Sequence, residues 1–94
     1  MDVRTLKNTL EEKAGKDSSN KMLTTVSHWM KRIFESNKGQ YETRDFNDIE
    51  ALEKLVALNI VALKRGSGRD NIIAELTKDG KELHMDFTKL GYYL

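Results

Sequence analysis

The side chains that could carry out catalysis or hold a metal ion are few and scattered along the chain. His28 and His84 are the two histidines, and neither belongs to a His-Glu-x-x-His pair or a comparable metal-binding spacing. The Gly-Ser-Gly run at 66–68 is not followed by the Lys-Ser or Lys-Thr of a phosphate-binding loop. These patterns predict a protein that is not an enzyme and that has no catalytic residues, no metal site and no cofactor.

The residues best suited to binding are basic and flank the same Gly-Ser-Gly run. Lys64, Arg65 and Arg69 stand there with no acidic residue among them. Residues 60–76 are predicted to form a β-hairpin whose glycines permit a positive φ in the turn and whose tip carries these cations. Cations at an exposed tip can neutralise phosphates. The same pattern is typical of a solvated turn without a ligand, and the residues alone leave both interpretations open.

A helix is predicted over residues 47–58, directly before the hairpin. Asn47 is a favourable N-cap, and Glu50 lies three residues on, where it can complete a capping box. Asn59 suits the left-handed position that ends a helix, and Ile60 is expected to fold back onto the last turn. The apolar face of this helix is predicted to consist of Ile49, Leu52, Leu55 and Val56.

Three further helices are predicted from caps and apolar spacing, over residues 2–14, 19–36 and 78–90. Gly15 and Gly91 are expected to end the first and the last of them, and residues 16–20 are expected to form a linker. The core helix has the broadest apolar face, made of Met22, Leu23, Val26, Trp29, Met30 and Ile33, with Phe34 near its edge. Thr77 is expected to cap the last helix, whose apolar face is Leu83, Phe87 and Leu90.

Two stretches are less regular. The N-terminal helix has only a narrow apolar stripe of Val3, Leu6 and Leu10, which can pack on its own domain or on another subunit. Residues 40–42 are predicted to form a short strand. After it, Thr43 can cap at most about one helical turn before Phe46, which is expected to point into the core.

The run Leu-Thr-Lys-Asp-Gly-Lys-Glu-Leu at 76–83, after a helix and a hairpin with a basic tip, resembles winged helix-turn-helix proteins. Proteins of this kind are common among small bacterial and archaeal regulators. The resemblance covers roughly residues 20–90. It implies one α+β, mainly helical domain over residues 1–94, with an extra N-terminal helix, a two- to three-stranded antiparallel wing sheet and a C-terminal helix. Residues 47–58 take the place of the recognition helix, although the full helix that should precede them has no room.

Charge decides how such a domain could meet DNA. Residues 40–59 contain five acidic and two basic side chains, and Glu50 and Glu53 are predicted to point outward, which repels phosphate. We therefore expect a non-enzymatic protein that binds duplex DNA mainly through the wing, as a regulator or chromatin-type factor. The expected DNA-binding residues are Lys64, Arg65 and Arg69, supported by Lys31 and Arg32.

A protein-interaction module is the alternative, such as a small accessory subunit of a replication or transcription complex. In that case the domain would dock through its acidic helix and its apolar ends. The residues expected to bind a partner are Glu50, Glu53, Val3, Leu6, Leu10, Tyr92 and Tyr93, with Leu94 beside them. Pairing of two copies into a homodimer is compatible with either function.

Composition sets the surroundings in which these functions are expected. The 94 residues carry a formal net charge of +1 and contain no cysteine, so neither a disulfide nor a thiolate metal site is expected. No apolar run approaches the ~18 residues of a membrane span. A cytoplasmic protein without a membrane partner is expected, associated with the nucleoid if it binds DNA.

Overall fold

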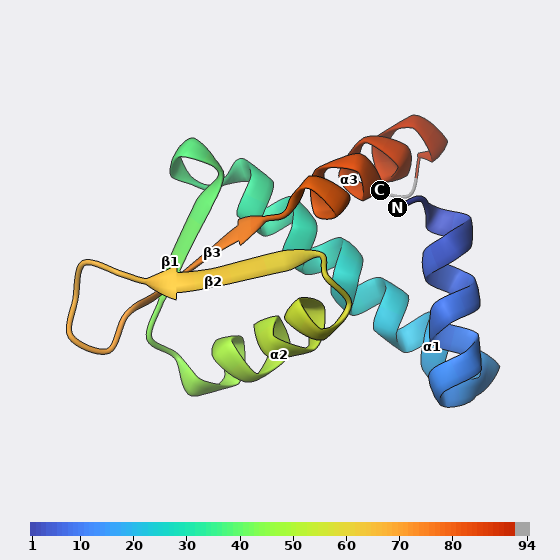
Figure 1. Cartoon of the computed structure of the whole chain (residues 1–94), viewed down its shortest axis with the longest axis horizontal. Coiled ribbons are helices and arrows are strands. Elements are labelled where there is room, and N and C mark those ends of the chain that lie inside the picture. The colour runs from blue at the N-terminus through green and yellow to red at the C-terminus, as the bar shows by residue number, and fades with distance from the viewer. Residues whose placement is uncertain (92–94) are drawn as a thin grey trace.

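Three helices pack against one face of a small antiparallel sheet (Figure 1). The computed structural model describes residues 1–91, without the side chains of Ala14 and Lys16. The expected α+β class is confirmed. The elements, in chain order, are α1 (Val3–Glu35), η1 (Asn37–Gly39), β1 (Gln40–Thr43), α2 (Phe46–Ala57), β2 (Val61–Arg65), β3 (Ile72–Leu76) and α3 (Lys78–Leu90).

Helix α1 is broken at Gly15 into two limbs, residues 3–14 and 16–35. Gly15 has φ 81°, a conformation that glycine adopts without strain, so the predicted end of the first limb is confirmed. The predicted linker at 16–20 is wrong, because the second limb begins immediately after Gly15. A single glycine therefore makes the whole turn, and Ser19 is a buried residue within the second limb.

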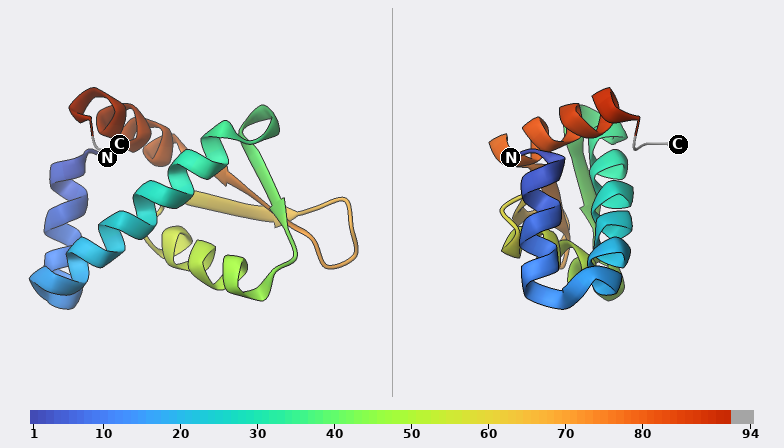
Figure 2. Two further views of the ribbon diagram at one scale, coloured as in Figure 1. Left: turned by 180° about the vertical axis from the view of Figure 1, so that it is seen from behind. Right: turned by 90° about the vertical axis from the view of Figure 1, so that its right-hand side faces the viewer.

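The second limb of α1 crosses the sheet diagonally, as the view from behind shows (Figure 2, left), and supplies the centre of the core. Val26, Met30 and Ile33 are fully buried, and Trp29 is nearly so, as predicted. The first limb closes the core from the side. Its amide at Val3 donates to Oδ2 of Asp86 on α3, at 2.8 Å.

The apolar stripe of the first limb is part of this core. Val3, Leu6 and Leu10 are all buried. Of the two interpretations left open by the sequence, packing on the protein's own domain is the one observed. The prediction that these three residues bind a partner is therefore wrong for this fold, because their side chains already have an intramolecular apolar surface to cover.

The sheet has the strand order β1-β3-β2, and its two faces differ in character. Tyr41, Ala74 and Leu63 are paired in one row on the face that meets the helices. Residues alternate between faces along a strand, so the next row, Glu42, Ile73 and Lys64, lies on the opposite face. We call that opposite face the outer face.

Helix α2 begins differently from the prediction. Asp45, not Asn47, is the N-cap, and its Oδ1 accepts from the amides of Asn47 and Asp48. Only Arg44 and Asp45 connect β1 to α2, so no helix lies between these two elements. Phe46 is 77% exposed, and its predicted place in the core is wrong.

A polar cluster between β1 and α2 explains this earlier start. Thr43 Oγ1 accepts from the amide of Asp45 and donates to Oδ2 of Asp48, at 3.1 and 3.0 Å. The hydroxyl of Tyr41 donates to the same Asp48 oxygen at 3.0 Å. Burial, followed by this hydrogen bond, raises the pKa of the Tyr41 phenol. Because Asp48 faces the sheet, Phe46, two residues earlier on the helix, is turned to the outside.

The end of α2 follows the prediction. Asn59 has φ 62°, and the amides of Asn59 and Ile60 donate to the carbonyls of Val56 and Leu55, which is a Schellman motif. Leu52 and Leu55 form the buried face as expected. Val56 is exposed instead, so its predicted place on the apolar face is wrong.

Helix α3 has the predicted bounds, with Thr77 as N-cap and Gly91 as C-cap. Leu83 and Phe87 are buried, but Leu90 is exposed, contrary to expectation. The predicted partner residues Tyr92 and Tyr93, and Leu94 beside them, lie outside the described residues. Gly80 has a role that its helix propensity does not indicate, because a Cβ built there would lie 2.1 Å from the carbonyl oxygen of Ile60.

We expect Gly80→Ala to destabilise the protein by about 1–3 kcal/mol, since the added methyl forces α3 away from the start of β2. Helix propensity alone predicts the opposite sign, a gain of about 1 kcal/mol. Urea unfolding followed by circular dichroism distinguishes the two. Lys81→Ala, on the exposed neighbouring residue, is the control, and a raised unfolding midpoint for Gly80→Ala would contradict the close approach.

Candidate functional site

The loop of the hairpin, residues 66–71, is closed by its own backbone. The amide of Gly66 donates to the carbonyl of Asn71 at 2.8 Å, and the amide of Asn71 donates to the carbonyl of Gly68 at 3.3 Å. Gly66 and Gly68 do not have a positive φ, so the expected reason for these glycines is wrong. They are small because a Cβ at either position would lie 2.8 Å from the side chain of Asn71.

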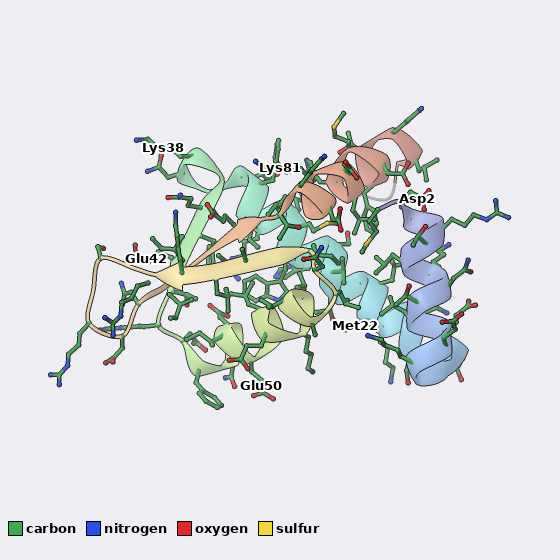
Figure 3. All side chains as sticks on the ribbon, viewed as in Figure 1. Asp2, Met22, Lys38, Glu42, Glu50 and Lys81 are labelled. Atoms are coloured by element: carbon green, nitrogen blue, oxygen red, sulfur yellow. The ribbon has the colours of Figure 1, made fainter. Side chains whose placement is uncertain are left out.

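A carboxylate on β1 anchors this loop. Glu42 Oε2 accepts from Oγ of Ser67 at 3.0 Å and from Nδ2 of Asn71 at 2.5 Å. These bonds, the Asn71 bond first, lower the pKa of the Glu42 carboxyl. Figure 3 shows Glu42 beside the point where β2 runs into the loop. The sequence gives little sign of this contact, because it joins residues that are 25 and 29 positions apart.

The three basic residues predicted at the hairpin tip do not form one cluster. Lys64 lies on the outer face, where its Nζ is 3.5 Å from Oε2 of Glu75. Glu75 also accepts from Nε2 of Gln40, at 3.3 Å. With Glu42 on the same face, the outer face has more negative than positive charge. Arg65 is the next residue along β2, and its side chain therefore projects from the other side of the sheet.

Three arginines lie at the loop end of the sheet. Thr43, Ile72 and Arg65 are paired across the three strands, so Arg44, which follows Thr43, and Arg69, within the loop, belong to the same end. We call Arg44, Arg65 and Arg69 the arginine end. All three are exposed, and no ion pair involves them among the residues that the structure describes.

Arg44 was not among the predicted binding residues. The antiparallel pairing of β1 with β3, which the sequence does not reveal, is what brings it beside the hairpin loop. Three carboxylates share this end of the molecule, Glu42, Asp45 and Asp70, and that of Glu42 is engaged by the loop. That of Asp45 is occupied by the amides at the start of α2.

The two predicted supporting cations lie elsewhere. The guanidinium of Arg32 is stacked over the rings of Trp29 and Tyr41, at 5.2 and 4.8 Å from their centroids. Lys31 is exposed on the second limb of α1, which does not reach the loop in Figure 1 or in the left view of Figure 2. The structure therefore does not bring Lys31 and Arg32 together with the hairpin tip.

The outward side of α2 is acidic, as predicted, and also carries an aromatic ring. Phe46, Glu50, Glu53 and Ala57 are exposed and recur at helical spacing opposite the buried Leu52 and Leu55. We call these four residues the α2 stripe. Its exposed phenylalanine was missed because the sequence placed the helix start one residue too late.

Other classes of site find no support in the described part of the chain. No group of three or more histidine, aspartate and glutamate side chains is placed to hold a metal ion within residues 1–91. Among the described helices, none has the length and apolar character needed to cross a bilayer. Searches for a matching family model, a matching curated protein and a matching solved structure each found none.

The anchor at Glu42 can be tested by titration. Because the ionised carboxylate accepts the loop's hydrogen bonds, its contribution to loop order is present above the ordinary glutamate pKa and is lost as the pH falls through the lowered pKa. We expect Asn71→Ala to raise the pKa of Glu42 toward the ordinary value, as measured by carboxyl-carbon NMR. Ser67→Ala should raise it less, and an unchanged value in Asn71→Ala would refute the anchor.

Proposed function

We propose that this protein is a non-enzymatic winged-helix domain that associates with duplex DNA through its arginine end. The order of elements supports the fold proposal, since a helix, a strand, a second helix and a hairpin follow one another before a closing helix. The domain would be a reduced form, in which Arg44 and Asp45 replace the helix that normally precedes the recognition helix. A regulator or chromatin-type role in the cytoplasm, associated with the nucleoid, fits this proposal.

The observation that carries the proposal is the arginine end itself. Its three guanidinium groups are exposed and form no ion pair within the described part of the chain, and they belong to the end of the sheet whose loop is held by backbone bonds and by Glu42. A closed loop loses little further conformational entropy on binding, so the cations are already positioned for phosphates. The acidic α2 stripe disfavours reading of bases by this helix. The contact would therefore be mainly with the backbone or the minor groove, with weak sequence preference.

We expect the wild-type protein to bind a random duplex about 40-fold more weakly at 200 mM than at 50 mM salt, because three phosphate contacts give a slope of about −2.7. Arg44→Ala, Arg65→Ala and Arg69→Ala combined should abolish this binding. Fluorescence anisotropy of a labelled duplex measures both effects.

Lys64→Ala is the matched control, because Lys64 is adjacent in sequence but paired with Glu75 on the outer face. Its affinity should stay close to that of the wild type. Unchanged binding in the triple variant would exclude the arginine end as the contact. A loss in Lys64→Ala equal to that in Arg65→Ala, which removes the same single charge, would show that only the total charge matters.

A second candidate function is favoured by one observation, the exposure of Phe46. An aromatic side chain that is 77% exposed at the start of an acidic helix face exposes apolar surface to water without any intramolecular benefit. Aromatic residues of this kind are enriched where proteins bind one another. The domain would then be a protein-interaction module, such as an accessory subunit of a replication or transcription complex, that docks through the α2 stripe.

A further inference from the structure

A groove on the side of α3 has no role in the functions considered so far. It lies between the C-terminal end of α1 and the exposed side of α3, and its volume is about 620 Å³. It is lined by Phe34, Lys81, His84, Met85, Thr88 and Lys89. The ring of Phe34 is stacked on His84, with centroids 4.0 Å apart. Phe34 is nevertheless 55% exposed and Met85 is 70% exposed, so the floor of the groove is an apolar surface open to solvent.

The rim of this groove is basic. Lys81 and Lys89 border it, and Lys81 and Phe34 also border an adjoining hollow that reaches Lys38 and Gly39. Carboxylates also lie near these lysines. Glu75 is bound to Lys64 and Gln40, and the charge of Glu35 acts to raise the pKa of His84. Lys89 also borders a hollow lined by Asp2, Glu82 and Asp86, whose carboxylates accept from the amide of Thr5, the N-terminal amine and the amide of Val3. The charged residues that line the groove itself are Lys81 and Lys89. An apolar floor with a basic rim is complementary to an amphipathic helix that has acidic residues and an exposed apolar side chain.

The chain contains such a helix face on its opposite side. The α2 stripe has two carboxylates, Glu50 and Glu53, on the same exposed side as Phe46. Figure 3 shows Glu50 at the α2 edge of the molecule and Lys81 at the α3 edge. The two surfaces are therefore complementary in charge, and they face away from each other within one molecule.

We propose that the α2 stripe of one copy docks into the α3 groove of a second copy, so that the protein associates head to tail. This proposal rests on the second candidate function and names the partner of the α2 stripe. Phe46 would cover the exposed side chains of Phe34 and Met85. Glu50 and Glu53 would face Lys81 and Lys89. Because donor and acceptor surfaces lie on opposite edges, the contact is heterologous, and it extends into chains or closes into rings.

Sedimentation velocity tests this in the absence of DNA, over about 10–500 μM protein, the range in which weak associations are populated. We expect the mean mass of the wild type to rise with concentration beyond that of a dimer. Glu50→Lys/Glu53→Lys and Lys81→Glu/Lys89→Glu should each weaken association by about tenfold or more, because each opposes like charges. Phe46→Ala should also weaken it, without changing the charge.

Mixing the two charge-reversed variants is the decisive step. Each variant alone places like charges in the contact, whereas in the mixture every α2 stripe meets a groove of opposite charge, so association should return. Glu11→Lys/Glu12→Lys provides the matched control, since it makes the same charge change on exposed residues of the first limb of α1. Because its α2 stripe and its groove are unchanged, this variant alone should associate like the wild type.

Three results would overturn the proposal: a wild type that remains monomeric throughout, either reversed variant associating like the wild type, or a mixture that stays monomeric. All the substituted residues are exposed, and circular dichroism confirms that each variant is folded. Because no DNA is present, failure of head-to-tail association leaves the arginine end unaffected. If Glu50→Lys/Glu53→Lys loses association and Lys81→Glu/Lys89→Glu does not, the α2 stripe binds somewhere other than the groove.

Discussion

The carbonyl oxygen of Ile60 is the point on which the arrangement of the domain depends. It accepts from the amide of Thr77 at 3.0 Å and from the hydroxyl of Thr77 at 3.1 Å. Thr77 Oγ1 in turn accepts from the amide of Gly80, and the missing side chain of Gly80 is what lets α3 approach this oxygen. One backbone group therefore connects the end of α2, the start of β2, the end of β3 and the start of α3. These contacts hold the hairpin against the end of α2 and the start of α3.

This geometry gives a physical reason for the Leu-Thr-x-x-Gly-x-x-Leu run at 76–83. Thr77 caps a helix and binds the preceding strand, Gly80 allows the close approach, and Leu83 enters the core one turn later. The bounds of α3 and the Schellman motif at Asn59 could be predicted because their signals are local. The start of α2 could not, since Asp45 becomes the cap only through the hydroxyl of Thr43 and the position of Asp48 against the sheet.

The candidate site also contains some features that local sequence predicts and others that depend on contacts between distant segments. Separation of Lys64 from Arg65 follows from the two-residue period of a strand and was available from the sequence. The partner of Lys64 was not, because Glu75 lies opposite Ala62 only in the observed register. Arg44 and Glu42 join the hairpin loop through the pairing of β1 with β3, a contact between distant segments. Long-range strand pairing therefore determines which basic residues lie at the hairpin loop without an acidic partner on the same face. The local sequence shows only that basic residues are present.

The net charge of this molecule is only +1, but its positive and negative side chains are concentrated on different elements. The hairpin end is rich in arginine, the outward side of α2 is acidic, and the α3 groove is basic. An isolated copy near DNA would have its acidic stripe repelled by phosphates while its arginine end is attracted. In a head-to-tail assembly the lysines of one groove would neutralise the stripe of the next copy, which removes that repulsion. The same assembly would carry several arginine ends, and where geometry lets them reach one duplex together their combined attraction would exceed that of a single weak contact.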